Sequence, residues 1–312
     1  MKIMITGGLG FIGSHLAEKL CNKHNIVILT KTNSKIKNVS HISNKLKIEK
    51  VDVTNFSKLQ KSIKLNKPDV IFHLAGETSH SKSFDNPIYD LDLNAKSTLY
   101  LLEIIKKLNL KCRIILGSTF IVVGRPQKLP VTEETPCNPT TIYGTNRLTS
   151  ENYCKIYHSL YGLDVVIFRI TNSFGPREQI TSNKNAVNFL IYKASKKEDV
   201  TIFNQGKFFR DLIYVSDVIS GLEIIMKKGK SGNLYWISSG KKIWFDKLGK
   251  MLENLTKTKV KYVSASKYAK KVDVGNFIVD NSKLKSLGWK PKIPIKEGIK
   301  NTIEYFKHEK II

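Results

Sequence analysis

The sequence predicts an α/β fold, in which helices cover a doubly wound parallel sheet and a smaller, mixed C-terminal lobe follows. Residues 1 to about 170 alternate short β-branched segments with helical patterns, which is typical of a parallel sheet with helices on both faces. After Gly175-Pro176 the pattern becomes less regular, and Pro291 and Pro294 stand near the end. Ligands of such sheets bind at the carboxyl ends of the strands, so the smaller lobe is expected to lie there.

Six short apolar segments are expected to form the strands of the sheet: residues 2–5, 26–29, 47–51, 70–73, 112–117 and 164–168. Helices are expected from Ser14 to about Lys23, from Asp90 to Leu108 and from Tyr143 to Tyr161. We therefore assign residues 1–172 to the sheet domain, with a return of the chain around residues 212–238. Residues 173–312 are assigned to the smaller lobe.

Composition bounds the class of protein. The chain has 312 residues, 41% of them hydrophobic, which is enough for a substantial core. Its formal net charge of +26 is spread along the chain without interleaved exposed aromatics, so a nucleic acid partner is disfavoured. No apolar run approaches membrane-spanning length and no leader pattern precedes the first strand, so we expect no membrane partner and a cytoplasmic protein. The four cysteines lack metal or disulfide spacing, so reduced structural thiols and no metal site are expected.

A glycine-rich turn opens the sequence. The apolar strand Ile3-Met4-Ile5 runs into Thr6-Gly7-Gly8-Leu9-Gly10-Phe11-Ile12-Gly13, and a helix is expected directly after it. Glycines at positions 7, 10 and 13 suit a tight turn, a close approach of the backbone to a pyrophosphate, and close packing of the helix on the strand. The phosphates would lie at the helix N-terminus. The turn therefore predicts a Rossmann-like dinucleotide-binding domain.

Tyr143 and Arg147 form a second informative pair. Four residues apart on an expected helix, the phenol and the guanidinium share one face and can meet one ligand. The cation favours the phenolate, so Tyr143 can serve as a base and Arg147 as its electrostatic activator. Only six residues of this lysine-rich chain are arginines, which indicates that position 147 needs the planar guanidinium fork.

The chain resembles extended short-chain dehydrogenases/reductases of the nucleotide-sugar epimerase and dehydratase family, similar to UDP-glucose 4-epimerase, over almost its whole length. Beyond the glycine-rich turn and the helix of Tyr143, the matching segments are Val51-Asp52-Val53, His73-Leu74-Ala75-Gly76, Gly117-Ser118-Thr119, Phe168 to Arg177, Arg210 to Val218 and Leu287-Gly288-Trp289-Lys290-Pro291. Their order and spacing make the resemblance specific for the family and leave the subfamily open.

The resemblance implies a set of cofactor-binding residues. Asp52 would hold the adenine amino group and Val53 its ring, while Asn94 would lie near the nicotinamide end. The remaining residues line the dinucleotide from the pyrophosphate to the nicotinamide ribose: Gly7, Gly10, Phe11, Ile12, Gly13, Leu74, Ala75, Gly76, Tyr143 and Arg147.

The end of the second strand bears on the choice between NAD and NADP. NAD-binding members usually carry a carboxylate there, whereas this chain has Thr30 and Lys31 followed by Thr32, Asn33, Ser34 and Lys35. Lys31 and Lys35 can accommodate a 2′-phosphate. The sequence therefore favours NADP slightly over NAD, although lysine is common throughout the chain.

The same resemblance implies the chemistry. Thr119 and Tyr143 would hydrogen-bond one sugar oxygen, with Ser118 as a substitute hydroxyl, and Tyr143 would remove the proton while a hydride leaves the carbon. Asn172 and Arg210 would bind the sugar and the diphosphate of a nucleotide-diphosphate sugar. The family normally has lysine where this chain has Arg147, and arginine keeps the charge but cannot relay a proton. We therefore expect slower or specialised chemistry.

Two substitutions narrow the reaction. The 4,6-dehydratases of the family have Asp and Glu directly after the catalytic threonine, whereas this chain has Phe120 and Ile121, so dehydration is disfavoured. Epimerisation, keto-sugar reduction and alcohol oxidation remain. The alternative is a catalytically silent dinucleotide-binding relative that acts through a macromolecular partner.

Two further expectations concern the substrate lobe and assembly. Nucleotide and sugar contacts are expected from the segment around Ile180 to Lys193 and from the C-terminal lobe, where Lys270 or Lys271 replaces an arginine that is frequent in the family. Members of the family are often dimers, so a homodimer is expected through the helices of residues 90–107 and 143–161.

Overall fold

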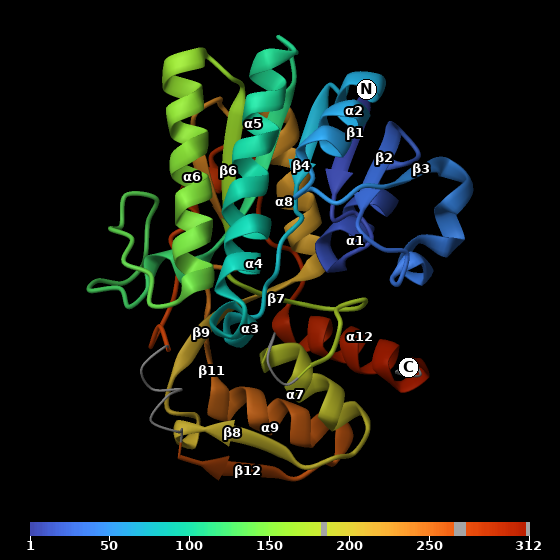
Figure 1. Ribbon diagram of the computed structural model, residues 1–312. Helices are drawn as coiled ribbons and strands as arrows, with labels where there is room; N and C mark the ends of the chain where they lie inside the picture. The colour runs from blue at the N-terminus through green and yellow to red at the C-terminus, as the bar shows by residue number, and fades with distance from the viewer. Residues whose placement is uncertain (182–185, 265–272, 310–312) are drawn as a thin grey trace.

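The structure is a computed structural model and describes residues 1–181, 186–264 and 273–309 (Figure 1). Seven strands form one parallel sheet in the order β10-β6-β5-β4-β1-β2-β3. Their bounds are β1 Lys2–Thr6, β2 Asn25–Thr30, β3 Leu46–Lys50, β4 Val70–His73, β5 Arg113–Thr119, β6 Val165–Ile170 and β10 Leu234–Ile237. The strand order reverses between β1 and β4, where Ile3 lies opposite Ile26 on one side and Val70 on the other. Ligands of doubly wound sheets bind at such a switch point.

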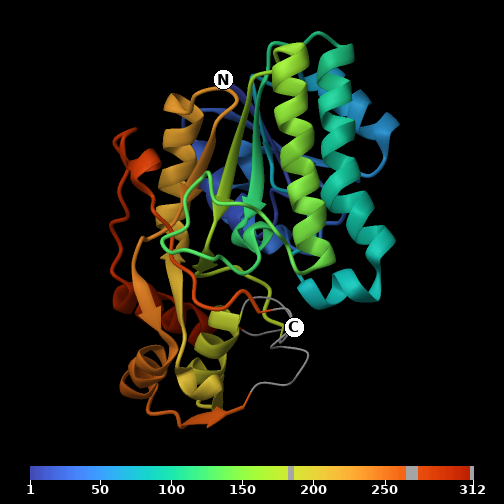
Figure 2. The ribbon, with the colours of Figure 1, turned by 90° about the vertical axis from the view of Figure 1, so that its left-hand side faces the viewer.

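Helices cover both faces of the sheet. The longer ones are α1 Phe11–Leu20, α2 Phe56–Asn66, α5 Ser97–Lys107, α6 Ile142–Tyr161 and α8 Val215–Lys228. Figure 2 shows α5 and α6 side by side on one face and α8 on the opposite face. Shorter helical segments are η1 Ile36–Lys45, α3 His80–Asp85, α4 Pro87–Leu91, η2 Asp92–Lys96 and η3 Phe120–Val123.

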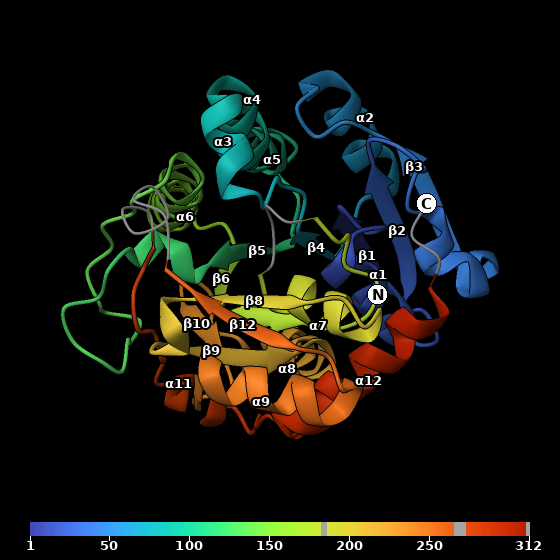
Figure 3. The ribbon, with the colours of Figure 1, turned by 90° about the horizontal axis from the view of Figure 1, so that it is seen from below.

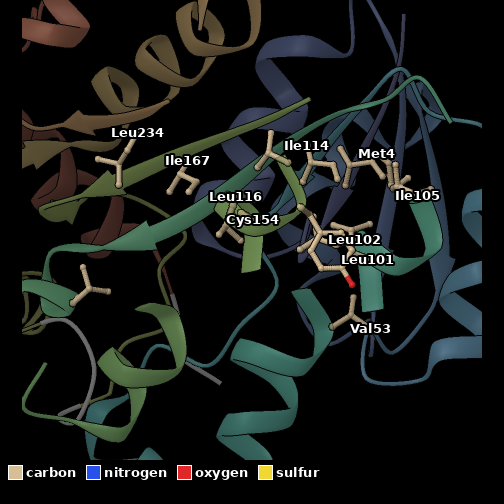
Figure 4. Close-up of a cluster of buried hydrophobic side chains, with 14 of the residues drawn as sticks. Met4, Val53, Leu101, Leu102, Ile105, Ile114, Leu116, Cys154, Ile167 and Leu234 are labelled. Atoms are coloured by element: carbon tan, nitrogen blue, oxygen red, sulfur yellow. The ribbon is translucent and has the colours of Figure 1, made fainter. Parts of the chain in front are cut away.

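Each face of the sheet has its own core because successive strand residues point to opposite sides. Met4, Ile114, Leu116 and Ile167 point to the face of α5 and α6, where they pack with Leu101 (Figure 4). The alternate residues of β1, Ile3 and Ile5, belong to the core of the other face together with Leu16 and Ile219. All of these side chains are less than 5% exposed. The continuous apolar strands of the sequence are thus explained by burial on both faces.

The smaller lobe lies below the carboxyl ends of the strands (Figures 1 and 3). It contains two small sheets, β11-β9-β7 and β12-β8. Their strands are β7 Asn172–Phe174, β8 Val200–Phe203, β9 Phe209–Tyr214, β11 Lys242–Trp244 and β12 Val260–Val263. The helical segments are α7 Ala186–Ser195, η4 Asn204–Gly206, α9 Phe245–Thr256, α11 Ser282–Lys285 and α12 Ile295–His308. A separate apolar core with Phe174, Leu212 and Phe306 holds this lobe together.

The predicted fold class is confirmed, and all six predicted strands are present within two residues of their expected ends. The chain returns to the large sheet through α8 and β10, which pairs with β6. The helix expected over residues 90–108 is interrupted by the π-helical turn η2, which the sequence pattern did not show. No helix among the described residues is long and apolar enough to cross a membrane. The division into domains at residue 172 stays a prediction.

Candidate active site

A cleft of about 890 Å³ lies between the carboxyl ends of the sheet and the smaller lobe. It brings together residues from the segments that follow β1 and β4 and from β5, α6, β7 and β9. The predicted site residues that line it are Gly7, Gly10, Phe11, Ile12, Gly13, Thr30, Lys31, Leu74, Ala75, Gly76, Ser118, Thr119, Tyr143, Arg147, Asn172 and Arg210. Most of the predicted site residues therefore share one cavity, while the role of each stays a prediction.

The glycine-rich turn forms the wall of the cleft beside α1. Gly7 has φ +68°, and its amide donates to the carbonyl of Leu29 at 2.9 Å, which ties the turn to β2. A Cβ at Gly13 would lie 2.5 Å from the carbonyl oxygen of Gly7, so only glycine allows the helix to approach this closely. No side chain caps the N-terminus of α1 at Gly10. Its amides are therefore available for an anion, and this cradle fits a pyrophosphate.

The pair Tyr143 and Arg147 lies on the inner face of α6. Helix α6 begins after Thr141, whose hydroxyl accepts from the amide of Gly144 at 3.0 Å. Both side chains are about 5% exposed, and the Arg147 guanidinium carbon lies 5.8 Å from the centre of the Tyr143 ring. The guanidinium donates from Nη1 to the carbonyl of Gly117 at 3.2 Å and from Nη2 to that of Ala75 at 3.5 Å. Main-chain oxygens of two strand ends therefore hold it in place.

The positive charge of Arg147 also affects His73, which lies beneath the glycine-rich turn. His73, at the end of β4, is fully buried, and its Nδ1 lies 2.9 Å from the Thr6 hydroxyl. Burial, followed by the positive charge of Arg147, lowers the pKa of His73 to about 3. The imidazole is therefore neutral at physiological pH. The Thr6 hydroxyl in turn accepts from the amides of Leu74 and Ala75, which fixes the start of the loop after β4.

Thr119 and Ser118 end β5, but they differ in what they bind. The Ser118 hydroxyl donates to Glu151 Oε1 at 2.5 Å. Glu151 forms a buried ion pair with Arg169, in which Nη2 and Oε2 are 2.7 Å apart. The Thr119 hydroxyl accepts a long 3.3 Å bond from the amide of Ile121. Since Ser118 is engaged by the carboxylate, Thr119 is the better placed of the two for a ligand.

Arg210 lies at the opposite end of the cleft. Its guanidinium donates to Asp273 and to the carbonyl of Gly275, and its carbon lies 4.9 Å from the centre of the Phe208 ring. Phe208 stacks on Phe245 with ring centres 4.2 Å apart, and both rings line the cleft. Burial lowers the pKa of Arg210, although Asp273 opposes this effect. A cation beside a flat aromatic pair suits a phosphate next to an apolar or planar group.

The residue next to Arg210 in the sequence is not its ion-pair partner. Asp211 is completely buried. Its carboxylate accepts from the amides of Ser239 and Gly240 and from the Ser239 hydroxyl. Asp211 therefore joins β9 to the loop after β10, and Asp273 takes the position of the ion-pair partner. Burial raises the pKa of Asp211 to about 6 despite these hydrogen bonds.

Lys31 and Asp52 form an ion pair with a distance of 3.1 Å at the end of the cleft beside β2 and β3. The ammonium also lies 5.1 Å from the centre of the Tyr89 ring. The hydrogen bond to Asp52 raises the pKa of Lys31. Burial opposes ionisation of Asp52, but hydrogen bonds from Thr54 and Lys31 outweigh it and lower the pKa of Asp52. The two residues that the sequence assigned to separate parts of the dinucleotide are thus in contact.

Three of the predicted cofactor residues do not line the cleft. Asp52 reaches it only through Lys31, and Val53 is buried in the core beside α2 and α5. Asn94 is buried behind Gly76, and its Nδ2 donates to Asp90 at 3.0 Å and to the carbonyl of Glu77 at 3.2 Å. Lys270, Lys271 and residues 182–185 of the expected substrate segment lie outside the described residues.

Comparison with known proteins confirms the family membership that these features indicate. The family model described as GDP-mannose 4,6 dehydratase matches residues 4–302. UDP-glucuronic acid decarboxylase 1 of Xenopus tropicalis is 30% identical over 320 residues, which cover 99% of this chain and 72% of that protein. The chain belongs to the extended short-chain dehydrogenase/reductase family of epimerases and dehydratases. It is therefore an enzyme of the extended short-chain dehydrogenase/reductase type.

Solved structures of this family agree in fold over the whole chain. The crystal structure of UDP-glucose 4-epimerase from Thermotoga maritima, with UDP-glucose, has a TM-score of 0.90 at 30% identity, and the match covers 98% of each chain. The structure of UDP-glucuronic acid 4-epimerase from Bacillus cereus, with UDP-glucuronic acid and NAD, has a TM-score of 0.86 at 26% identity. That match covers 98% of this chain and 99% of the other.

Within this family fold, the sequence missed several side chains of the cleft. Asp273, Phe208, Phe245 and Thr78 all line it. Asp273 stands two residues after Lys271, where the sequence expected substrate contacts, so an acidic residue there was a usable signal. The contact between Phe208 and Phe245 joins positions 37 residues apart. Local sequence carries no signal for such a contact.

Proposed function

We propose that the protein is a nucleotide-sugar epimerase that keeps NAD bound through its cycle. The observation that carries the proposal is that one cleft contains Tyr143, Thr119 and Arg147 at one end and Arg210 at the other. The first three suit proton and hydride chemistry on a sugar hydroxyl. Arg210 suits the diphosphate of the substrate. The epimerases of Thermotoga maritima and Bacillus cereus, with UDP-glucose and UDP-glucuronic acid in their structures, support a substrate of this class.

When bound, the dinucleotide would supply the hydride acceptor and donor for the sugar carbon, and the residues of this chain would hold the sugar and move the proton. Tyr143 removes the proton of the hydroxyl on that carbon, while the Thr119 hydroxyl holds the same oxygen. The resulting keto-sugar turns its other face, and Tyr143 gives the proton back. The sugar then carries the inverted hydroxyl, and Tyr143 ends in its initial protonation state. Arg147 supplies the fixed positive charge beside the phenol.

Dehydration is disfavoured in this proposal. Phe120 and Ile121, which replace the acid and the base of the dehydratases, line the cleft beside Thr119. Phe120 packs edge-on against Phe277 with ring centres 5.1 Å apart. Neither side chain can transfer a proton. The wall on this side of the sugar is therefore apolar.

The adenosine end bears on the choice of dinucleotide. The sequence favoured NADP because Lys31 and Lys35 can meet a 2′-phosphate. The Lys31 ammonium is paired with Asp52, so it must leave this carboxylate to bind a phosphate. We therefore propose NAD, which needs no such exchange. Glycines 7, 10 and 13 would hold its pyrophosphate, and Ala75, Gly76 and Arg147 would line its nicotinamide ribose.

A homodimer is proposed for the assembly. Exposed apolar side chains lie on α4 and on the last turns of α6: Ile88, Leu91, Ile156, Leu160 and Tyr161 are each more than 40% exposed. Figure 1 shows α5 and α6 side by side at the surface, with α4 continuing below α5. A second copy of the chain would cover this apolar face. Light scattering of Leu160→Glu against the unchanged protein tests it, with a monomer expected for the variant.

A keto-sugar reductase is the second candidate. It uses the same Tyr143 and Thr119 but consumes a reduced dinucleotide in each turnover. A catalytically silent relative is the third, and the placement of Tyr143, Thr119 and Arg210 in one cleft argues against it, since a binding module has no need of them together.

One experiment separates these candidates. The protein as purified is denatured, the released dinucleotide is identified by chromatography, and the native protein is then given UDP-glucose, UDP-N-acetylglucosamine and UDP-glucuronic acid in turn. We expect stoichiometric NAD and epimerisation of one of these sugars. Tyr143→Phe should lower turnover about 10³-fold and leave NAD bound. An empty protein that binds NADPH and reduces a 4-keto-sugar would overturn the proposal, as would full activity of Tyr143→Phe.

A further inference from the structure

Gly76 and Arg147 are in close contact in the wall of the cleft. A Cβ at residue 76 would lie 1.8 Å from Nη2 and 2.8 Å from Cζ of Arg147. Unlike Gly7 and Gly124, Gly76 has no positive φ, so its backbone conformation does not require glycine. The absence of a side chain at position 76 is therefore required by the guanidinium and not by the backbone.

Hydrogen bonds hold the groups around this space in place. The guanidinium is bonded to the carbonyls of Ala75, just after β4, and of Gly117, in β5. The Asn94 amide oxygen would lie 2.6 Å from the same Cβ. Asn94 is fixed because its Nδ2 donates to Asp90, which also accepts from Asn146 of α6 at 2.7 Å. A methyl group at position 76 would have to displace the guanidinium itself.

The position of the guanidinium has a chemical consequence. A lysine ammonium can lose and regain a proton, whereas a guanidinium stays protonated at any pH a protein tolerates. Epimerisation needs no proton relay, because Tyr143 returns to the sugar oxygen the proton that it removed. A net reduction leaves Tyr143 without its proton, and with Arg147 the replacement must wait until the cleft opens to solvent.

We propose that Gly76 and Arg147 are a coupled pair: the missing side chain at residue 76 admits a fixed guanidinium, and this guanidinium confines the site to a reaction without net proton transfer. The inference rests on the proposed epimerase function for its second part. Its first part concerns only the geometry and can be tested without a sugar. Gly76 is in this view a positioning residue, since it acts through Arg147.

The test is a four-variant cycle of the whole protein: unchanged, Gly76→Ala, Arg147→Lys and both together. The first measurement is NAD affinity of the dinucleotide-free protein by fluorescence titration, with melting temperature measured beside it. Gly76→Ala should weaken NAD binding at least tenfold, because the displaced guanidinium enters the cofactor space. Adding Arg147→Lys should restore part of this loss, because a lysine side chain is narrower, while the contact of the new methyl group with Asn94 remains. Additive effects, or unchanged affinity in Gly76→Ala, would overturn the coupling.

A matched control uses Gly117, which also lines the cleft. A Cβ there would have Phe168 at 3.1 Å and Leu74 at 3.2 Å as its two nearest side chains, and no Arg147 atom is among its three nearest atoms, although Arg147 donates to the Gly117 carbonyl. Gly117→Ala should therefore lose affinity or stability to the same extent whether it is made alone or together with Arg147→Lys. If Arg147→Lys rescued Gly117→Ala as well, the rescue would be a general loosening of the site, and the specific pairing would be wrong.

The second measurement tests the confinement of the reaction. With NAD and UDP-glucose as the probe, absorbance at 340 nm counts reduced dinucleotide left behind, and chromatography counts epimerised sugar. The ratio of reduced dinucleotide to epimerised sugar should rise at least fivefold in Arg147→Lys. An unchanged ratio would refute the confinement while leaving the Gly76 coupling intact. If no sugar nucleotide is epimerised by any variant, the proposed function fails, and the affinity cycle still decides the coupling.

Discussion

The two ends of the cleft are built in different ways. The end beside the glycine-rich turn is made mostly of main chain: Gly13 packs against the Gly7 carbonyl, and Arg147 is held by the carbonyls of Ala75 and Gly117. The end in the smaller lobe is made of side chains. There Arg210 is held by Asp273 and lies over the ring of Phe208, which stacks on Phe245.

This difference predicts how each end responds to mutation. A main-chain surface leaves no room for an added Cβ, so at the first end a single methyl group is expected to weaken binding about tenfold or more. A side-chain surface can repack around an apolar change, so at the second end the loss of affinity should depend on the contact removed, small for an aromatic ring and large for the charged guanidinium. Mutations that break either rule would show that the comparison is wrong.

The largest effect is expected for Gly13→Ala. The new Cβ would lie 2.5 Å from the Gly7 carbonyl oxygen and 2.7 Å from the Gly8 Cα, so α1 must move away from the turn. We expect NAD affinity to fall more than about 100-fold and stability to fall by about 1–3 kcal/mol. Isothermal titration and thermal melting measure the two effects.

Gly221→Ala is the control for Gly13→Ala. Gly221 lies in α8, and the three atoms nearest to its added Cβ would all belong to the side chain of Ile237, at 3.2 Å or more. This variant should lose stability with little change in NAD affinity. Equal losses of affinity in both variants would mean that the turn is not the dinucleotide site.

The next largest effect is expected at Arg210. Arg210→Met removes the charged fork and leaves Asp273, a carboxylate, at the expected diphosphate position. KM for the sugar nucleotide should rise about 100-fold or more, since an interfacial charge pair contributes about 2–5 kcal/mol when one partner is removed. NAD affinity should not change. If kcat fell instead and KM stayed constant, Arg210 would act at the reacting carbon and not at the diphosphate.

A moderate effect is expected from pH, through His73 beneath the turn. Its pKa is about 3 in the folded protein and 6.5 as the ordinary value, so between these limits the unfolded chain binds a proton that the native protein does not. The contribution of His73 to the free energy of unfolding is therefore almost fully present above pH 6.5, and it decreases as the pH drops below this value. The loss between pH 7 and pH 5 should be about 2 kcal/mol from this group.

Urea unfolding of the unchanged protein and of His73→Gln at pH 7 and pH 5 measures this effect. In His73→Gln the free energy of unfolding should change less between pH 7 and pH 5, by about the contribution of His73. His15, whose pKa burial lowers to about 4, contributes equally to the pH dependence of both proteins. Parallel curves for the two proteins would show that His73 binds a proton equally well in the native and unfolded states.

The smallest effect is expected at the aromatic pair. Phe208→Leu keeps an apolar side chain but loses the stack on Phe245 and the flat face under Arg210. KM for the sugar nucleotide should rise about threefold to tenfold, because such aromatic pairs contribute about 0.5–1.5 kcal/mol. A rise as large as that of Arg210→Met would mean that Phe208 itself binds the substrate and that the smaller lobe does not repack.

Much of the cofactor end could be predicted from sequence because its determinants are local. Gly7, Gly10 and Gly13 stand within seven residues, directly between a strand and a helix, and Tyr143 and Arg147 are four residues apart on one helix. Short-range geometry converts these spacings into positions in space. The six strands were likewise predictable because each is a short, continuous apolar run buried on both faces.

Contacts between distant segments could not be predicted in this way. The engagement of Ser118 by Glu151, of Lys31 by Asp52 and of Arg210 by Asp273 each joins residues at least 21 positions apart. Which of several lysines or acids meets a given partner depends on how strands and loops are placed, and local patterns do not encode that placement.

The sequence by itself thus determined the parallel sheet, the glycine-rich turn and the placement of Tyr143 and Arg147 on one face of α6, because periodicity and spacing reflect local geometry. The tertiary structure alone decided that Thr119 rather than Ser118 is open to a ligand, that Arg210 faces Asp273, and that Gly76 leaves room for Arg147. These outcomes depend on packing, in which a difference of one methyl group decides whether two segments can approach.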